Sequence, residues 1–281
     1  MSVDSDMLEL RQISAENQLK WDAYYRQYQD DSVMPGVKYP NEHLVRLLHA
    51  RIRAGCRPAD ETVLEVGFGS IANLLMMHRL GFCVRGLEVS EDAVERARKA
   101  LRGLGLAEEI PVALHDGGDL PFPNATLDMV IGLQCVYYNL DQPRFVEECA
   151  RVTRPGGSVI FSFFSPRHAY LRYAVPVRGD LSRFTEEHPN PRLRGLRLFR
   201  CRSREHLREL YGRYFDVEVG LDEYDVFPMR QSWYYVIGRK RGAGRPFGEF
   251  VSTPPEPKGG DGTAAPAGWD REAAARENLV L

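Results

Sequence analysis

The segment TVLEVGFGSIANLL, residues 62–75, constrains the fold more than any other stretch of the chain. A short apolar and β-branched run leads into a turn that contains Gly67 and Gly69, and a helical pattern follows. A strand that enters a helix through a glycine turn presents backbone N–H groups and the positive end of the helix dipole to a ligand. Ile71 stands where many such loops carry a third glycine. Because isoleucine avoids positive φ, we expect helical or extended backbone there, with the side chain either reshaping the ligand site or turned toward the core.

Strands and helices alternate through the hundred residues that start with this segment. The predicted strands are 62–66, 83–88, 111–115, 127–133 and 158–164, and the predicted helices between them are 70–80, 91–105 and 142–154. This alternation indicates βαβ units, and therefore a parallel sheet with helices on both faces. Two helices, 15–30 and 41–55, precede the first strand, and Asn41 and Ser90 are expected to cap the helices that follow them.

Pattern and composition divide the chain into a helical cap or lid, 1–60, an alternating domain, 61–241, and a tail, 242–281. The tail is rich in glycine and proline, which predicts disorder. Within the domain, residues 165–201 form an arginine-rich insert with little periodicity after the fifth strand. A helix over 203–214 then leads to two strands, 215–226 and 232–240, which are close enough in sequence to pair antiparallel.

Composition excludes several classes of protein. The net charge of -2 and the pI near 6.4 imply no global attraction to nucleic acid or to an anionic membrane. No apolar run approaches the roughly 20 residues that span a bilayer, and the N-terminal MSVDSDMLEL does not resemble a signal peptide. The five cysteines are scattered, and the seven histidines lack metal-ligand spacing. These features predict a soluble cytoplasmic protein without a disulfide framework or a metal site.

The glycine turn alone does not identify its ligand. Glu88 ends the second predicted strand, where a carboxylate can accept hydrogen bonds from both ribose hydroxyls of an adenosine. NAD-dependent enzymes share this arrangement. The run GFGSIA also fits the looser dinucleotide pattern, with Ala72 as its last small residue.

Four segments in order distinguish the alternatives: LEVGFGSIANL, GLEVSEDAVERAR, HDGGDLPFPNATLDMVIGLQCVYY and EECARVTRPGGSVIFS. In them the chain resembles the class I S-adenosylmethionine-dependent methyltransferases, in particular the methyltransferase type 11-like branch that acts on small molecules. The resemblance covers about residues 60–165. It implies a Rossmann-like, doubly wound α/β fold with a mostly parallel seven-stranded sheet and an antiparallel last strand. SREHLRELYGRYFDVEVG and SWYYVIGRK are similar to the closing strand pair of that family, which a dinucleotide dehydrogenase lacks.

The resemblance implies S-adenosyl-L-methionine as the cofactor. Carried over residue by residue, it assigns the methionine end to Glu65 and the backbone at Gly67, and the ribose hydroxyls to Glu88, with Gly69 as a further cofactor-binding residue of the turn. The other implied contacts are Asp116 and Gly117 at the adenine edge, and Leu133 and Gln134 beside the amino-acid moiety.

Methyl transfer depends mostly on alignment and on the exclusion of water. A general base is needed only if the acceptor must lose a proton. His115, Tyr137 and His168 follow or end predicted strands at the carboxyl edge of the sheet, so they are the catalytic candidates. Ordinary packing or the shaping of the substrate site is the alternative for each, and His115 could instead neighbour the adenine. The aromatic residues of the first helix, which would cover the cofactor or pack on the core, are Tyr24, Tyr25 and Tyr28.

The stretch from 167 to 213 contains twelve arginines against five acidic residues. Because the guanidinium fork suits carboxylate or phosphate, an anionic acceptor is one interpretation, and a solvated charged insert is the other. The balanced overall charge argues against nucleic acid as a partner. The predicted function is methyl transfer to oxygen or nitrogen of a small molecule, in a pocket formed by the insert 165–201 and the N-terminal helices. The alternatives are a non-catalytic binding protein of this fold and an NAD-dependent oxidoreductase.

Overall fold

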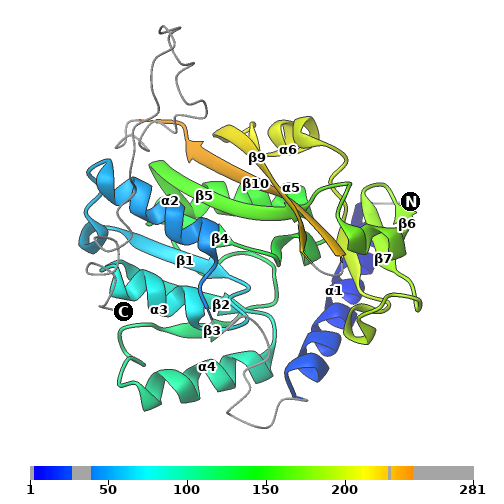
Figure 1. Cartoon of the computed structure of the whole chain (residues 1–281), viewed down its shortest axis with the longest axis horizontal. Helices are drawn as coiled ribbons and strands as arrows, with labels where there is room; N and C mark the ends of the chain where they lie inside the picture. Colours follow the sequence, from blue (N-terminus) through cyan, green and yellow to red (C-terminus); the bar gives the residue numbers. More distant parts are fainter. Residues whose placement is uncertain (1–2, 27–38, 227–228, 243–281) are drawn as a thin grey trace, which may run out of the picture. The chain divides into compact units, whose positions relative to one another are not determined.

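The computed structural model describes residues 3–26, 39–226 and 229–242 (Figure 1). One sheet of seven strands has the order β3-β2-β1-β4-β5-β10-β9. Its strands are β1 Thr62–Val66, β2 Cys83–Glu88, β3 Val112–Leu114, β4 Leu127–Gly132, β5 Thr153–Phe164, β9 Phe215–Val226 and β10 Met229–Lys240. Strands β1 to β5 are parallel, and β10 is antiparallel to both of its neighbours, β5 and β9. This confirms the predicted mostly parallel sheet with an antiparallel last strand.

Helices cover both faces of the sheet (Figure 1). They are α1 Val3–Arg26, α2 Glu42–Arg53, α3 Ala72–Arg79, α4 Glu91–Gly103, α5 Gln142–Val152 and α6 Arg204–Tyr211, with short 3₁₀ turns at Pro58–Asp60, Val136–Tyr138, Ala169–Tyr173 and Pro191–Leu193. One apolar cluster joins the sheet to α2, α3 and α4, and a second joins it to α5 and α6. Along β4, Met129 and Ile131 belong to the first cluster and Val130 to the second, because successive side chains of a strand alternate between its faces.

The two predicted N-caps are confirmed. Asn41 Oδ1 accepts the backbone N–H of Leu44, 3.1 Å away, at the start of α2. Ser90 Oγ accepts that of Ala93 at 3.3 Å at the start of α4. Each side chain satisfies one of the N–H groups that the first turn of a helix leaves without an intrahelical partner.

Two boundaries differ most from the prediction. Helix α1 begins at Val3 instead of residue 15, and the predicted extension over 27–30 lies outside the described residues. Strand β5 begins at Thr153 and includes the Pro-Gly-Gly run that was expected to separate a helix from a strand. The pairing with β4 shifts between Leu127 and Met129, so the extra residues of β5 form a bulge, which lets a strand contain proline and glycine.

The arginine-rich insert contains a second, three-stranded antiparallel sheet, in contrast to the irregular segment that its lack of periodicity predicted. Its strands are β6 Ala174–Arg178, β7 Leu181–Phe184 and β8 Arg197–Phe199. These strands are only three to five residues long, too short for a clear alternation of apolar and polar residues. Helix α1 lies beside this small sheet (Figure 1), and Asn17 exchanges two hydrogen bonds with the backbone of Arg197, of 2.8 and 3.1 Å.

None of the helices in the described part has the length and apolar character that a membrane crossing requires. The tail predicted from residue 242 onward lies, apart from Gly242, outside the described residues.

Candidate active site

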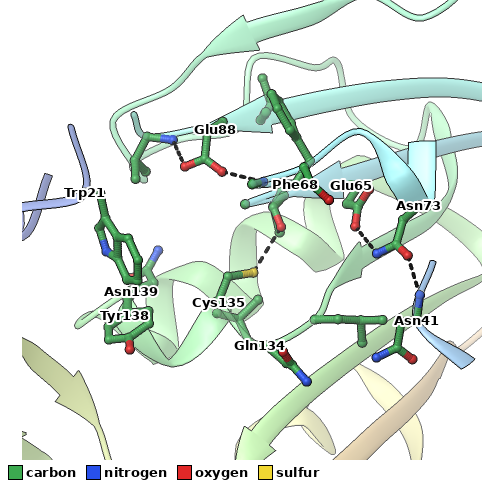
Figure 2. Close-up of a pocket in the computed structure, with 18 of the residues that line it drawn as sticks. Trp21, Asn41, Glu65, Phe68, Asn73, Glu88, Gln134, Cys135, Tyr138 and Asn139 are labelled. Atoms are coloured by element: carbon green, nitrogen blue, oxygen red, sulfur yellow. Dashed lines mark hydrogen bonds between the residues drawn. The ribbon is translucent and has the colours of Figure 1, made fainter. Parts of the chain in front are cut away.

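A pocket of about 980 Å³ lies at the carboxyl ends of β1, β2 and β4 (Figure 2). The strand order of the sheet reverses between β1 and β4, and ligands of open parallel sheets bind at such a point. The loops after these strands line the pocket together with α1, the first turns of α2, and parts of β9 and β10. The pocket therefore draws on segments that are far apart in the sequence, from α1 to β10.

The turn after β1 has a backbone that glycine tolerates best. The φ values of Gly67 and Gly69 are 64° and 52°, in the left-handed region. A Cβ at Gly67 would lie 2.7 Å from Cys135 Sγ, and one at Gly69 would lie 2.6 Å from the hydroxyl oxygen of Tyr25. Both glycines are thus required by their backbone angles and by the close approach of the β4 loop and of α1.

Ile71 does not line the pocket. Its backbone has φ -77° and ψ 5°, at the start of α3, and its buried side chain packs in the apolar cluster between the sheet and α2, α3 and α4. Of the two alternatives for this residue, the one turned toward the core is confirmed. The unusual turn therefore leaves the pocket open.

Glu88 ends β2 with its carboxylate buried at the pocket wall. Oε2 accepts the N–H of Gly69 at 2.8 Å, and Oε1 accepts those of Val89 at 2.8 Å and Ser90 at 3.2 Å. Burial raises the pKa of this carboxyl group, and the three backbone N–H donors oppose that rise. Oε1 already accepts two hydrogen bonds and Oε2 only one, so Oε2 keeps acceptor capacity for a ligand.

Glu65, near the end of β1, is only 2% exposed. Oε1 accepts a hydrogen bond from Asn73 Nδ2 at 2.7 Å, whereas Oε2 has no partner among the described residues. Burial raises the pKa of Glu65 to about 8. Asn73 Oδ1 in turn accepts the backbone N–H of Asn41, which joins the start of α2 to this carboxyl group (Figure 2). A buried carboxyl oxygen without a donor is suited to a cationic ligand.

The residues after β3 form a connected turn at the pocket. His115 Nδ1 accepts the N–H of Gly117 at 3.1 Å, and Nε2 lies 2.8 Å from the carbonyl oxygen of Asp119, to which it donates. Asn139 Nδ2 donates to the carbonyl of Gly117 at 2.9 Å. His115, Asp116 and Gly117 all line the pocket. Because both ring nitrogens of His115 are engaged, the contacts favour a structural role for this side chain.

Gln134 follows β4 with φ 59°, an uncommon backbone conformation for a residue other than glycine. Ser162 Oγ accepts its N–H at 2.7 Å, and the hydroxyl of Tyr137 donates to its carbonyl at 2.8 Å. Leu133 and Gln134 both line the pocket. Strained residues persist where the surrounding structure holds them and are frequent at binding sites.

Two of the three catalytic candidates lie outside the pocket lining. Tyr137 is buried, with its hydroxyl directed to the Gln134 carbonyl. His168 is buried beyond β5, where Nδ1 accepts the N–H of Tyr170 at 3.1 Å and Nε2 lies 3.1 Å from Gln231 Oε1. Burial lowers the pKa of His168 to about 4. The placement of these two residues gives no support to the proton-transfer role predicted for them.

Other pocket residues are ones that the sequence did not single out. His43 Nε2 lies 2.8 Å from Asp222 Oδ2, and both residues line the pocket. They are 179 positions apart, so no local pattern could have joined them. On α1, Trp21 lies against Tyr138 with ring centroids 5.0 Å apart. The predicted aromatic cover is also at the pocket: Tyr24 and Tyr25 line it, while Tyr28 lies outside the described residues.

Comparison with known proteins identifies a methyltransferase domain within the chain. A family model described as a methyltransferase domain matches residues 64–161. The chain is 32% identical over 136 residues to a demethylmenaquinone methyltransferase of Tropheryma whipplei, covering 44% of this chain and 55% of that protein. It is 36% identical over 99 residues to a phosphatidylethanolamine N-methyltransferase of Cereibacter sphaeroides, covering 35% and 48%. The chain thus spans about half the length of these relatives.

Solved structures agree on the fold. A structure described as a SAM-dependent methyltransferase from Methanosarcina mazei aligns with a TM-score of 0.55 at 18% identity, covering 68% of this chain and 96% of the other. The mostly parallel seven-stranded sheet with its antiparallel last strand is the one that the resemblance implied. Residues 64–161 therefore match a methyltransferase domain, and the chain has the fold of an S-adenosylmethionine-dependent methyltransferase.

Proposed function

We propose that this protein transfers the methyl group of S-adenosyl-L-methionine to an oxygen or nitrogen atom of a small acceptor. The observation that carries the proposal is one pocket with two kinds of lining. The glycine turn and two buried carboxyl groups form part of the lining, and aromatic and polar side chains of α1, α2, β9 and β10 form another part. Its volume of about 980 Å³ is at the upper end of the range of about 300–1,000 Å³ usual for small-molecule sites, which favours room for two ligands.

The carboxylates fit the cofactor. The ammonium group of its methionine moiety would supply the donor that Glu65 Oε2 lacks, and Glu88 would accept from the ribose hydroxyls. The other proposed contacts are Asp116 and Gly117 with the adenine, and Leu133 and Gln134 with the amino-acid moiety. When bound, the cofactor supplies a methyl group on an electrophilic sulfonium. The chain itself has to orient the acceptor and exclude water.

Helix α1 is the proposed cover of the pocket. Trp21, Tyr24 and Tyr25 line the pocket from this helix. No residue of the insert 165–201 is among the lining residues, so the support for a direct role of the insert in acceptor binding is weak. The insert instead contacts α1, through the paired hydrogen bonds of Asn17.

A neutral acceptor has more support than an anionic one. The anionic alternative rested on the arginines between 167 and 213, and none of them lines the pocket. Arg46 does line it, but its guanidinium is 2.5 Å from Glu42 Oε1. The non-catalytic alternative loses its main argument, because Ile71 lies in the core and does not close the pocket.

Thermal denaturation with candidate nucleotides tests the proposal. S-adenosylhomocysteine or S-adenosylmethionine at 100 times its dissociation constant should stabilise the protein by about 2.7 kcal/mol. This corresponds to a rise in Tm of roughly 5–10 °C for a domain of this size. NAD at the same concentration should give no rise. A rise with NAD alone, or with none of the three, would contradict the proposed cofactor, and transfer of a labelled methyl group to a panel of small acceptors then tests the reaction.

A further inference from the structure

His43 and Asp222 form a hydrogen-bonded pair in the wall of the pocket. His43 lies in the first turn of α2 and Asp222 in β9, and the atoms Nε2 and Oδ2 are 2.8 Å apart. The side chains are 36% and 25% exposed, and both line the pocket. The pair is therefore accessible to a bound molecule, and no role that the family resemblance assigned involves it.

The contact fixes which nitrogen of His43 can act as a base. A carboxylate only accepts hydrogen bonds, so Nε2 carries the proton of the pair and Nδ1 keeps its lone pair. Within the described part of the chain, no residue donates a hydrogen bond to Nδ1. An imidazole oriented by a carboxylate through one nitrogen, with the other nitrogen open, is the arrangement of a general base.

The pair lies on the side of the pocket where Glu65 lies. Asn41, two residues before His43, donates its backbone N–H to Asn73 Oδ1 at 2.8 Å, and Asn73 Nδ2 donates to Glu65 at 2.7 Å. Figure 2 shows Asn41, Asn73 and Glu65 on one side of the pocket and Glu88 on the other. If Glu65 holds the methionine end of the cofactor, as proposed above, the pair is near the end that carries the reactive methyl group.

The surroundings of the pair suit a flat, uncharged molecule. The ring of His43 lies against Tyr235 with centroids 4.8 Å apart, and Trp233 and Tyr224 line the same pocket. The buried indole N–H of Trp233 has no hydrogen-bond partner among the described residues. The other charged residues at this end of α2, Glu42 and Arg46, are paired with each other. Aromatic walls bind planar rings, and an unpaired indole N–H can donate to a ligand oxygen.

We infer that His43, positioned by Asp222, is the general base of this enzyme and that the acceptor is a planar molecule with a phenolic or enolic hydroxyl. The inference rests on the proposed function. His43 Nδ1 takes the hydroxyl proton while an oxygen electron pair forms the bond to the transferred methyl carbon. The electron pair of the broken carbon–sulfur bond stays on sulfur, which becomes a neutral thioether. Asp222 stabilises the imidazolium, which then loses its proton to solvent.

Phenols of graded acidity, from 4-methylphenol to 4-nitrophenol, test the base. With 4-methylphenol, His43→Gln should lower kcat by about 10²–10⁴-fold and change KM little. The loss should be much smaller with 4-nitrophenol, because this phenol ionises without help. Asp222→Asn should also lower kcat with 4-methylphenol. The amide of asparagine can donate to Nε2 of His43, which places the imidazole proton on Nδ1. His49→Gln, at an exposed position of the same helix, is the control and should leave both rates unchanged.

A measurement without turnover separates this inference from the proposed function. At a pH below the pKa of free 4-nitrophenol, the bound phenol should show the absorbance of its phenolate in the wild type with S-adenosylhomocysteine, and that of the neutral phenol in His43→Gln. Both proteins should bind S-adenosylhomocysteine with equal affinity, which also shows that the variant is folded. An equal loss of kcat with both phenols, an unchanged kcat, or no methylation of any phenol by a wild type that binds the cofactor would overturn the inference. Failure to bind S-adenosylhomocysteine at all would instead overturn the proposed function.

Discussion

The substitution Glu65→Gln should make the protein without cofactor more stable and the cofactor complex weaker. The folded carboxyl group has a pKa of about 8, against 4.5 as its ordinary value, because it is buried. Folded Glu65 therefore holds its proton at pH values where the unfolded chain has lost it. The free energy of unfolding is highest below pH 4.5 on this account and falls as the pH rises toward 8.

The size of this stability loss follows from the pH range between the ordinary pKa of Glu65 and its pKa in the folded protein. At about 1.4 kcal/mol for each pH unit, the loss between pH 4.5 and 7 is about 3 kcal/mol. Glutamine is neutral at every pH, and its carbonyl oxygen can accept the same hydrogen bond from Asn73. Urea denaturation from pH 5 to 8 should therefore show a variant that is little changed at pH 5 and about 3 kcal/mol more stable at pH 7.

Cofactor affinity should change in the opposite direction. The variant cannot provide an anionic partner for the ammonium group of S-adenosylhomocysteine, and a hydrogen bond to a charged group contributes about 1.5–3 kcal/mol. Calorimetry at pH 8 should show an affinity lower by roughly 10- to 150-fold. Glu108→Gln, at an exposed position, is the control for both measurements. Parallel pH profiles for variant and wild type, or equal affinities, would refute the reasoning.

Three other substitutions test the roles that the structure gives to Tyr137, Arg51 and Gly69. Tyr137→Phe leaves the carbonyl of Gln134 without its donor, so a loss of about 1–3 kcal/mol in stability and weaker S-adenosylhomocysteine binding are expected; a lower kcat with unchanged affinity and stability would restore a catalytic role. Arg51→Met breaks a buried ion pair in which Arg51 donates to Glu61 over 3.0 and 2.7 Å. The free energy of unfolding measured in urea should fall by about 3–5 kcal/mol. A fall below 1 kcal/mol would contradict this expectation. Gly69→Ala should lower both Tm and cofactor affinity, because its Cβ would lie 2.6 Å from the hydroxyl oxygen of Tyr25. An unchanged Tm and an unchanged affinity in calorimetry would show that α1 leaves room for a side chain at the turn.

The parts of the fold that could be predicted are those with a strong local pattern. The strand boundaries 62–66 and 83–88 and both N-caps agree with the structure, since each depends on residues adjacent in sequence. The bulge in β5 could not be predicted, because proline and glycine normally end a strand and only the partner β4 reveals the shift of register. The small sheet of the insert was not predicted, because strands of three to five residues contain too few positions to show a regular alternation of apolar and polar side chains.

The candidate site also contains residues that local patterns predict and residues that only the folded structure brings together. The predicted cofactor residues all line the pocket, because the parallel strands that carry them end at one edge. The proposed acceptor side depends on contacts between distant segments, such as His43 with Asp222. Tyr137 and His168 were reasonable candidates by position after a strand, but position does not tell whether a side chain faces the pocket or the core.

The arginine-rich insert has a structural explanation that needs no anionic ligand. Arg197 pairs with Glu16 of α1 at 2.5 Å, and Arg192 lies over the ring of Tyr24 at 5.1 Å from its centroid. Lys20 of α1 also donates to the carbonyl of Arg194 at 2.8 Å. Exposed ion pairs contribute little individually, but several contacts on one side of α1 together help to fix its position. Because α1 lines the pocket, these arginines support a wall of the site, and their excess in the sequence is explained without an anionic acceptor.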